Sequence, residues 1–279
     1  MVGRVDADIA KILPLLPLKD AAKLTPRRAR DELTALAESR KDMPLPQPAS
    51  VADIVIPNAS HPIPARVYRP ANLPAPTVMF FHGGGWVAGD LNTHDRLARL
   101  IAVDLDAVVV SVDYRRPPEA HFPAALEDCL AATRWAARNI AGLGADAGRL
   151  AVAGDSAGGN LAAAVAQACR EEGPALAGQL LIYPATDLAG AYRSDSENTK
   201  YPSRAENADG YFLTAKQMKW FWNHYLPSPA EIHEACQRFQ AGWDDSERRS
   251  RAPWAYSPRV IAVKEFDSDA TTQALVHFL

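Results

Sequence analysis

The sequence predicts an α/β fold in which a mostly parallel sheet is covered by helices on both faces. The first observation is a series of apolar runs of strand length, which lie at residues 77–81, 107–112, 149–153 and 179–183. The second observation is that segments long enough for helices separate these runs. Strands that are apolar throughout and alternate with helices are typical of a parallel sheet buried on both sides. In such sheets the chemistry lies beyond the carboxyl ends of the strands.

The connecting helices are expected at residues 93–104, 124–139 and 157–172. Before the parallel part, residues 1 to about 45 have mainly helical periodicity, and a helix is predicted over 26–39. Thr25 is a suitable N-cap for that helix, and Pro26 fits its first position. Short strands are predicted at 51–56 and 65–69, and a helix rich in aromatic residues at 216–225.

Length and composition limit the domain organisation and the partners. The chain has 279 residues, of which 48% are hydrophobic and 23% charged, with a net charge of −3. These values are typical of a soluble globular protein. We expect one domain over residues 1–279, with a helical cap formed by about 1–48 and about 187–235. Because Lys and Arg are slightly outnumbered and form no basic stripe, nucleic acid is not an expected partner.

Neither a membrane span nor a disulfide-linked exported protein is expected. The apolar stretch at residues 9–18 contains Lys11, Pro14 and Pro17, and no signal-cleavage site follows it. The three cysteines are an odd number without the spacing of a disulfide framework, so we expect reduced thiols. We therefore expect a cytoplasmic protein. A monomer or a homodimer is the expected assembly.

Ser156 is the candidate nucleophile. It lies in the sequence Gly154-Asp155-Ser156-Ala157-Gly158, between the predicted strand at 149–153 and the predicted helix at 157–172. A G-x-S-x-G sequence between a strand and a helix places the serine on a sharp turn with its hydroxyl exposed. The alternative is an ordinary glycine-rich loop without a catalytic role. Because the serine lies between a predicted strand and a predicted helix, the interpretation as a nucleophile is favoured.

A second glycine-rich sequence, His82-Gly83-Gly84-Gly85-Trp86, directly follows the predicted strand at 77–81. Consecutive glycines leave backbone N–H groups unobstructed, so that two of them can meet a developing oxyanion together with the N–H of Ala157. A phosphate-binding loop is the alternative, but the Lys-Ser or Lys-Thr pair that it needs is missing.

Together these sequences resemble the hormone-sensitive lipase-like carboxylesterases, which have an α/β-hydrolase fold with a helical cap. Further matches are Asp113-Tyr114-Arg115, Phe122-Pro123-Ala124-Ala125 and Leu181-Ile182-Tyr183-Pro184. The resemblance implies hydrolysis of a small-molecule ester through an acyl-serine, with no metal and no cofactor. One small departure is Arg116-Pro117, which stands where the family usually has an apolar residue and alanine.

Carried over to this chain, the resemblance assigns a role to each matching residue. Ser156 would be the nucleophile, and Gly84, Gly85 and Ala157 would form the oxyanion hole. His82 and Gly83 would belong to the supporting loop, in which His82 orders the backbone and is not the general base.

The C-terminal acid and histidine are the large departure from the family pattern. The resemblance places them on loops after two successive strands, and it makes Asp267 the candidate acid and His277 the candidate base. Only nine residues separate Asp267 from His277. Because neighbouring parallel strands need a crossover of about a dozen residues, the two cannot both occupy the family's positions. We therefore expect the C-terminal strand and helix portion to be shortened relative to the family.

Two alignments of this end remain open. Residues 269–279 also fit a helix in which His277 is an ordinary residue. Alternatively, residues 257–259 precede an internal loss, and Asp267 is then not the acid. The other histidines considered as substitutes fit surface or loop positions more simply; they are His61, His94, His121, His224 and His233.

Two functional hypotheses follow. The first is a carboxylic ester hydrolase acting on short- to medium-chain acyl esters through an acyl-serine. The alternative is a catalytically impaired or inactive homologue that at most binds an ester-like ligand. Loss of the base and its acid would remove most of the rate, while the oxyanion hole would keep on the order of a thousandfold over water.

Overall fold

A computed structural model describes residues 10–11, 21–185 and 202–226 of the chain. All of them belong to one compact unit, Met1–Pro227, whereas the second unit, Ser228–Leu279, lies outside the described residues. The candidates Asp267 and His277 are therefore outside the part that the structure describes.

The described residues contain one six-stranded sheet with the order β1-β2-β4-β3-β5-β6. Strands β3, β4, β5 and β6 are mutually parallel, whereas β1 and β2 pair antiparallel at one side. The strand bounds are β1 Ser50–Ile56, β2 Ile63–Arg69, β3 Ala75–Phe81, β4 Val108–Val112, β5 Ala145–Asp155 and β6 Gly178–Ile182. This confirms the predicted mostly parallel sheet.

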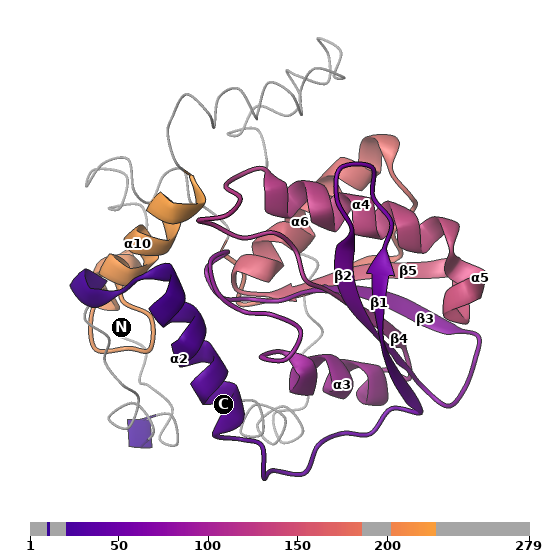
Figure 1. Cartoon of the computed structure of the whole chain (residues 1–279), viewed down its shortest axis with the longest axis horizontal. Coiled ribbons are helices and arrows are strands. Elements are labelled where there is room, and N and C mark those ends of the chain that lie inside the picture. The colour runs from indigo at the N-terminus through magenta and orange to yellow at the C-terminus, as the bar shows by residue number, and fades with distance from the viewer. Residues whose placement is uncertain (1–9, 12–20, 186–201, 227–279) are drawn as a thin grey trace. The chain divides into compact units, whose positions relative to one another are not determined.

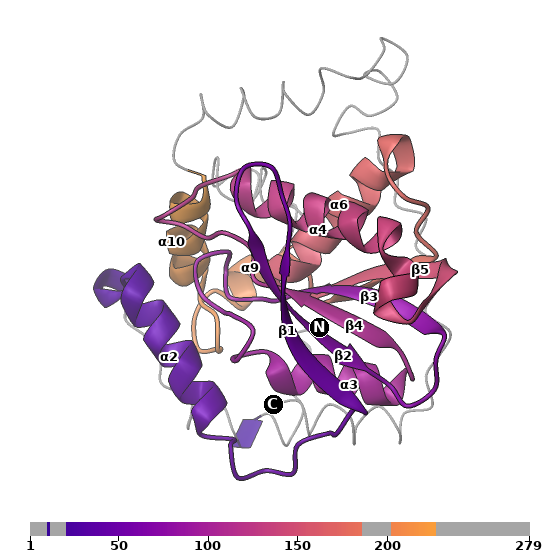
Figure 2. The same ribbon diagram turned by 45° about the vertical axis from the view of Figure 1, so that its right-hand side comes forward.

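Helices cover both faces of the sheet, as predicted. Figures 1 and 2 show α3 on one face, with α4 and α6 on the opposite face. All five residues of β4 are buried between these layers, which explains why that strand has no polar face. The helices around the sheet are α3 Asp95–Asp104, α4 Ala124–Arg138, α5 Ile140–Leu143 and α6 Ala157–Glu172.

The described segments of the expected cap also contain helices. They are η2 Ala21–Lys23, α2 Pro26–Glu38, α9 Pro202–Glu206 and α10 Ala215–Tyr225. Helix α2 begins as predicted, with the Thr25 side chain accepting a hydrogen bond from the Arg28 backbone N–H. The described helices include none long and apolar enough to cross a bilayer.

The predicted elements differ from the observed ones mainly at their ends. Strand β2 begins at Ile63, two residues earlier than predicted, and includes Pro64. A proline is compatible with this place because it lies one residue from the start of the strand, before the ladder with β4 begins at Ala65. Its carbonyl still accepts a hydrogen bond from the Asp113 N–H at 2.9 Å. Strand β5 extends from Ala145 to Asp155, beyond both predicted ends.

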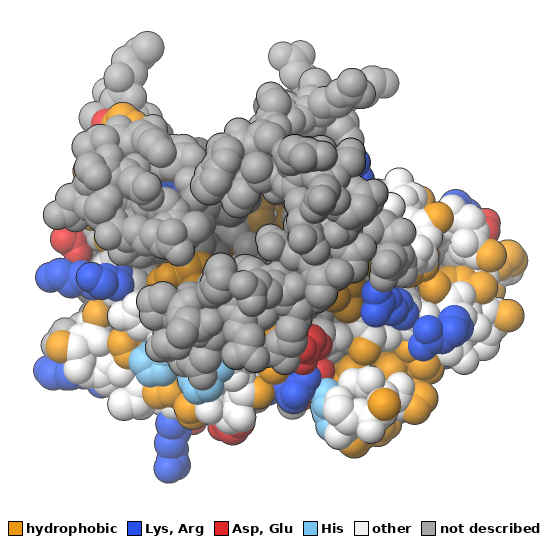
Figure 3. Space-filling model, turned by 90° about the horizontal axis from the view of Figure 1, so that it is seen from above, with side chains coloured by type: hydrophobic (Ala, Val, Ile, Leu, Met, Phe, Trp, Pro, Cys, Tyr) orange, Lys and Arg blue, Asp and Glu red, His pale blue; other side chains and the backbone are white. Residues whose placement is uncertain are grey.

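An apolar cluster joins α2 and α10 to the loop after β3. Leu24, Ala29 and Ala88 are buried in it, with Leu33, Trp220 and Phe221 packed around them. On the face drawn in Figure 3, the described Lys and Arg side chains are scattered among acidic and apolar ones. The described part of that face therefore presents no continuous basic patch.

Candidate active site

Two loops that carry candidate residues begin at the carboxyl ends of neighbouring strands. Strands β3 and β5 are parallel neighbours, and Phe81 at the end of β3 pairs with Gly154 near the end of β5. The His82 loop and the Ser156 turn therefore leave the sheet side by side. In open α/β sheets, ligands bind beyond the carboxyl ends of the strands, where these two loops lie.

The backbone at Ser156 has an uncommon conformation, with φ 52° and ψ −115°. A residue with a side chain rarely adopts such angles, and holding it there costs about 1–3 kcal/mol. Strain of this kind persists only where the surrounding structure over-determines it. The Ser156 side chain remains partly exposed, between the end of β5 and the first turn of α6.

Gly154 and Gly158 allow this turn because each packs directly on backbone. A Cβ at Gly154 would lie 2.7 Å from the Phe81 carbonyl oxygen and would also collide with Gly158. A Cβ at Gly158 would meet the carbonyl groups of Phe81 and His82. Side chains at these two positions would therefore push the turn away from β3.

The last residue of β6 and the segment that follows it also hold the turn. The Ser156 N–H donates to the Ile182 carbonyl at 2.9 Å, and the Ser156 carbonyl accepts from the Ala185 N–H at 3.2 Å. The Asn160 side chain donates to the Ala185 carbonyl at 2.9 Å. Ser156 is thus fixed by its own backbone bonds to the neighbouring parallel strand.

The loop after β3 has a glycine backbone in the left-handed region, with φ 119° at Gly84 and 62° at Gly85. The Gly84 carbonyl accepts from the N–H groups of Val87 and Ala88, which closes a tight turn. Within the described residues, the N–H groups of Gly84, Gly85 and Ala157 donate to no acceptor. These groups are available to a negatively charged oxygen.

Gly83 is held at both of its backbone polar groups. Its N–H donates to Asp155 Oδ1 at 2.9 Å, and its carbonyl lies 2.8 Å from His82 Nδ1. A Cβ at Gly83 would collide with the Asp155 carboxylate. Asp155 directly precedes Ser156, so this contact ties the glycine loop to the Ser156 turn.

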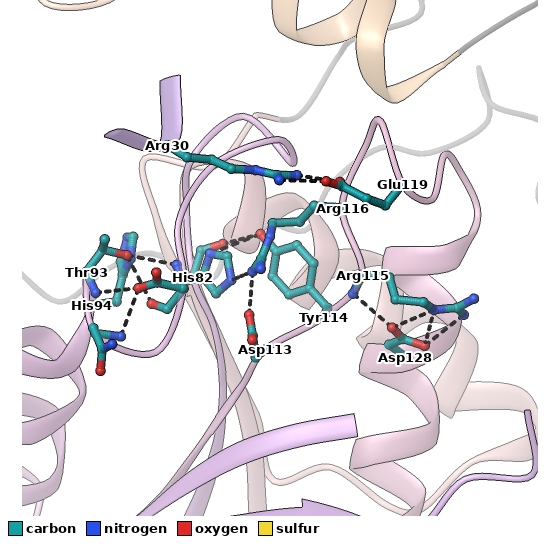
Figure 4. Close-up of polar contacts among 12 residues, drawn as sticks. Arg30, His82, Thr93, His94, Asp113, Tyr114, Arg115, Arg116, Glu119 and Asp128 are labelled. Atoms are coloured by element: carbon teal, nitrogen blue, oxygen red, sulfur yellow. Dashed lines mark hydrogen bonds and ion pairs between the residues drawn. The ribbon is translucent and has the colours of Figure 1, made fainter. Parts of the chain in front are cut away.

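His82 is fully buried, and both of its ring nitrogens have partners, the Gly83 carbonyl at Nδ1 and the Arg116 guanidinium at Nε2 (Figure 4). Arg116 Nη1 lies 3.2 Å from Nε2, and the ring stacks on Tyr114 with 4.3 Å between the centroids. Burial, followed by the nearby His94 and Arg116, holds the pKa of His82 well below its usual value of 6.5. Both nitrogens of this neutral ring have other partners, so neither is free to accept a proton from Ser156.

The structure adds partners to the loop that the sequence analysis did not single out. Asp155 lies within the G-x-S-x-G sequence, but its contact with Gly83 depends on the pairing of β3 with β5. His94 Nε2 lies 3.6 Å from Asp155 Oδ2. Arg30 on α2 donates to the Val87 carbonyl at 2.9 Å and pairs with Glu119 (Figure 4). In the sequence, Arg116 is recognisable only as a departure from the family pattern.

The described histidines that were considered as substitutes for the base have other partners. His61 Nε2 lies 2.8 Å from Asp128 Oδ1, His121 Nδ1 lies 2.8 Å from the His224 carbonyl, and His224 Nδ1 lies 2.9 Å from the Trp220 carbonyl. Among the described residues, no histidine forms a hydrogen bond with Ser156. His233, Asp267 and His277 lie outside the described residues.

The fold and this geometry define a class, an α/β-fold hydrolase with a serine on a strained strand-to-helix turn beside free backbone donors. Comparison with known proteins gives the family. The family model described as the alpha/beta hydrolase fold matches residues 78–273, more than half of the chain. The chain belongs to this family.

The chain is similar to two Mycobacterium tuberculosis proteins, esterase LipI and carboxylic ester hydrolase LipN. It is 42% identical to LipI over 272 residues, which are 94% of this chain and 78% of LipI. It is 39% identical to LipN over 247 residues, which are 86% of this chain and 61% of LipN.

A solved structure of an esterase from Pyrobaculum calidifontis matches with a TM-score of 0.73 at 36% identity, over 90% of this chain and 74% of that one. The resemblance to α/β-hydrolase carboxylesterases is thereby confirmed. The chain is a carboxylesterase of the serine hydrolase class.

Proposed function

We propose that this chain hydrolyses short- to medium-chain acyl esters, with Ser156 as the nucleophile and Gly84, Gly85 and Ala157 as the oxyanion hole. The observation that carries the proposal is the direct contact between the two loops. The Asp155 carboxylate binds the Gly83 N–H at 2.9 Å, so the residue before the serine anchors the residue before the first proposed oxyanion donor.

In the proposed reaction, Ser156 Oγ attacks the ester carbonyl carbon, and the carbonyl oxygen becomes an oxyanion. Collapse of this intermediate expels the alcohol and leaves an acyl-serine, which water then hydrolyses. Backbone N–H groups held in place before the reaction stabilise the oxyanion without reorganisation. Removal of one such donor typically costs about 10²–10³ in kcat. His82 and Gly83 support the loop in this scheme and leave the proton transfer to another group.

The proposed preference for short acyl groups is based on aromatic residues beside the glycine loop. A Cβ at Gly85 would collide with the Phe221 ring, so this ring lies directly against the loop. Trp86 stacks on Tyr225 with 4.7 Å between the centroids, and both side chains are buried. These contacts hold α10 against the glycine loop, and we propose that its aromatic rings limit the acyl chain to short or medium length.

The proton transfers require a base and an orienting acid. Asp267 and His277 remain the proposed candidates, with the alternatives described above. We also propose that the segments at about 1–48 and 187–235 form the cap, because α2 and α10 share one apolar cluster with Ala88. A cytoplasmic location is proposed from the cysteine pattern, and the described Cys129 and Cys169 are free thiols. The proposed assembly is a monomer or a homodimer.

Hydrolysis of p-nitrophenyl esters of increasing acyl length tests the proposal, with Ser156→Ala as the control. Serine-dependent turnover that declines from short to long acyl chains is the expected result. Equal slow rates in both proteins would reject Ser156 as the nucleophile and favour the impaired homologue. His277→Gln and Asp267→Asn then test the two C-terminal candidates, because loss of either triad member lowers kcat by several orders of magnitude.

A further inference from the structure

Arg116 occupies a place that neither the sequence motifs nor the comparisons explain. It follows β4, and its guanidinium reaches His82 Nε2 at 3.2 Å while pairing with the Asp113 carboxylate (Figure 4). The Arg116 side chain is only 18% exposed. Burying most of a cation costs free energy unless the cation is paired and hydrogen-bonded. The Arg116 guanidinium has both kinds of partner, the Asp113 carboxylate and the His82 ring.

The contacts of the His82 ring determine which nitrogen carries the proton. Arg116 can only donate, so Nε2 must accept and carries no hydrogen. At Nδ1, the Gly83 carbonyl can only accept. The Tyr114 hydroxyl already donates its hydrogen to the His82 carbonyl at 2.6 Å and is likewise an acceptor toward the ring. The contacts are therefore consistent only with the tautomer that has its hydrogen on Nδ1.

That hydrogen controls the orientation of a proposed oxyanion donor. The Gly83 carbonyl and the Gly84 N–H belong to the same planar peptide group, and in a trans peptide they point in opposite directions. A hydrogen bond from His82 Nδ1 to the Gly83 carbonyl, at 2.8 Å, therefore fixes the direction of the Gly84 N–H. If the hydrogen moved to Nε2, Nδ1 and the Gly83 carbonyl would both be acceptors and would repel each other.

We propose that Arg116 is a positioning residue for ester hydrolysis, which acts through the His82 tautomer to aim the Gly84 N–H. This inference rests on the proposed role of Gly84 in the oxyanion hole. Asp113 holds the Arg116 guanidinium in place, while Asp155 fixes the other side of Gly83. Gly83 is thus held at two successive peptide groups: Asp155 binds the N–H of the His82–Gly83 peptide, and the His82 ring binds the carbonyl of the Gly83–Gly84 peptide.

Arg116→Leu removes the donor, and Arg116→Lys keeps a positively charged donor within reach of Nε2. Arg149→Leu is the control. Like Arg116, Arg149 pairs with an aspartate three positions before it, Asp146, but it lies elsewhere in the protein. The double variant Asp113→Asn, Arg116→Leu avoids an unpaired carboxylate and serves if Arg116→Leu folds poorly. Circular dichroism melting checks the fold of each variant.

Two readouts are measured on each full-length variant. The first is the ¹H–¹⁵N correlation pattern of the His82 ring, assigned with His82→Gln, which distinguishes the tautomers without substrate. The second is kcat and KM for p-nitrophenyl acetate. Because a misdirected oxyanion donor affects the transition state and not the bound ester, kcat is expected to fall about tenfold with KM nearly unchanged.

The expected result is a pure Nδ1–H tautomer in the wild-type protein and Arg116→Lys, with mixed tautomers and lower kcat in Arg116→Leu. Folded Arg116→Leu with an unchanged tautomer and unchanged kcat would overturn the inference. An altered tautomer with unchanged kcat would also overturn it. If the wild-type protein shows no Ser156-dependent turnover, the proposed function fails, whereas the tautomer result still tests the link from Arg116 to His82.

Discussion

The two loops that meet at the carboxyl end of the sheet are held in different ways. The Ser156 turn is fixed by backbone, through glycines packed on β3 and hydrogen bonds to Ile182 and Ala185. The His82 loop is fixed by side chains, through Asp155, Arg30 and the His82 ring. A backbone-held turn should tolerate no added volume, whereas a loop held by side chains should respond in steps as each polar partner is removed.

Gly158→Ala should give the largest effect, because it adds volume where the turn packs on backbone. The new Cβ would collide with the Phe81 and His82 carbonyls, neither of which can move away as a flexible side chain would. We expect loss of more than about 100-fold in kcat/KM and about 1–3 kcal/mol of unfolding free energy. Ester kinetics and urea unfolding measure the two effects.

Gly142→Ala is the matched control for that change, since a Cβ at Gly142 meets no atom within 4 Å. It should leave kinetics unchanged and stability equal or slightly higher. A fully active Gly158→Ala protein would contradict the account of the turn.

Asp155→Ala should have the next largest effect, because it leaves the Gly83 N–H without its acceptor. The loop would lose its link to the Ser156 turn, and we expect kcat to fall about 10–100-fold. Asp155→Asn keeps a carbonyl oxygen that can accept this hydrogen bond, so its kcat should fall less. If the two variants were equally impaired, the negative charge rather than the hydrogen bond would be the important property of Asp155.

His82 should make stability depend on pH in a defined window. Its pKa in the folded state is below the usual 6.5, so the unfolded chain binds more protons between these two values. The contribution of neutral, buried His82 to the unfolding free energy is fully present above pH 6.5. It is lost as pH falls toward the pKa of His82 in the folded state, by at most about 1.4 kcal/mol per pH unit.

Urea unfolding between pH 7.5 and 5 measures this dependence. His82→Gln should have a shallower slope than the wild-type protein. An unchanged slope in His82→Gln would show that His82 does not remain neutral in the folded chain.

Arg30→Ala should give the smallest effect of this series. Arg30 donates to the Val87 carbonyl and pairs with Glu119, whose pKa this contact lowers to about 2. Because Glu119 is largely exposed, we expect the unfolding free energy to fall by only about 1 kcal/mol and kcat to fall a few-fold. Arg27→Ala on the same helix is the control, since the Arg27 side chain is 92% exposed. Equal effects of the two substitutions in melting and kinetic measurements would contradict a specific role for Arg30.

The sequence predicted the sheet, its covering helices and the two glycine-rich loops because their signals are local. Apolar runs, the Thr25 cap and the G-x-S-x-G pattern can each be recognised within a few residues. The partners of the loop could not be found in this way. Asp155 reaches Gly83 only because Phe81 pairs with Gly154, and Arg116 reaches His82 across the sheet edge. Contacts between residues distant in sequence depend on strand order, which local patterns do not specify.

Ser156, held in this turn, is proposed to form the acyl-enzyme. The most direct test of this claim is rapid mixing of the protein with p-nitrophenyl acetate, followed by peptide mass spectrometry of the acid-quenched sample. We predict an initial release of about one equivalent of p-nitrophenol, with the acetyl group on the peptide that contains Ser156. Acetylation at another residue, or the same release from Ser156→Ala, would contradict the claim.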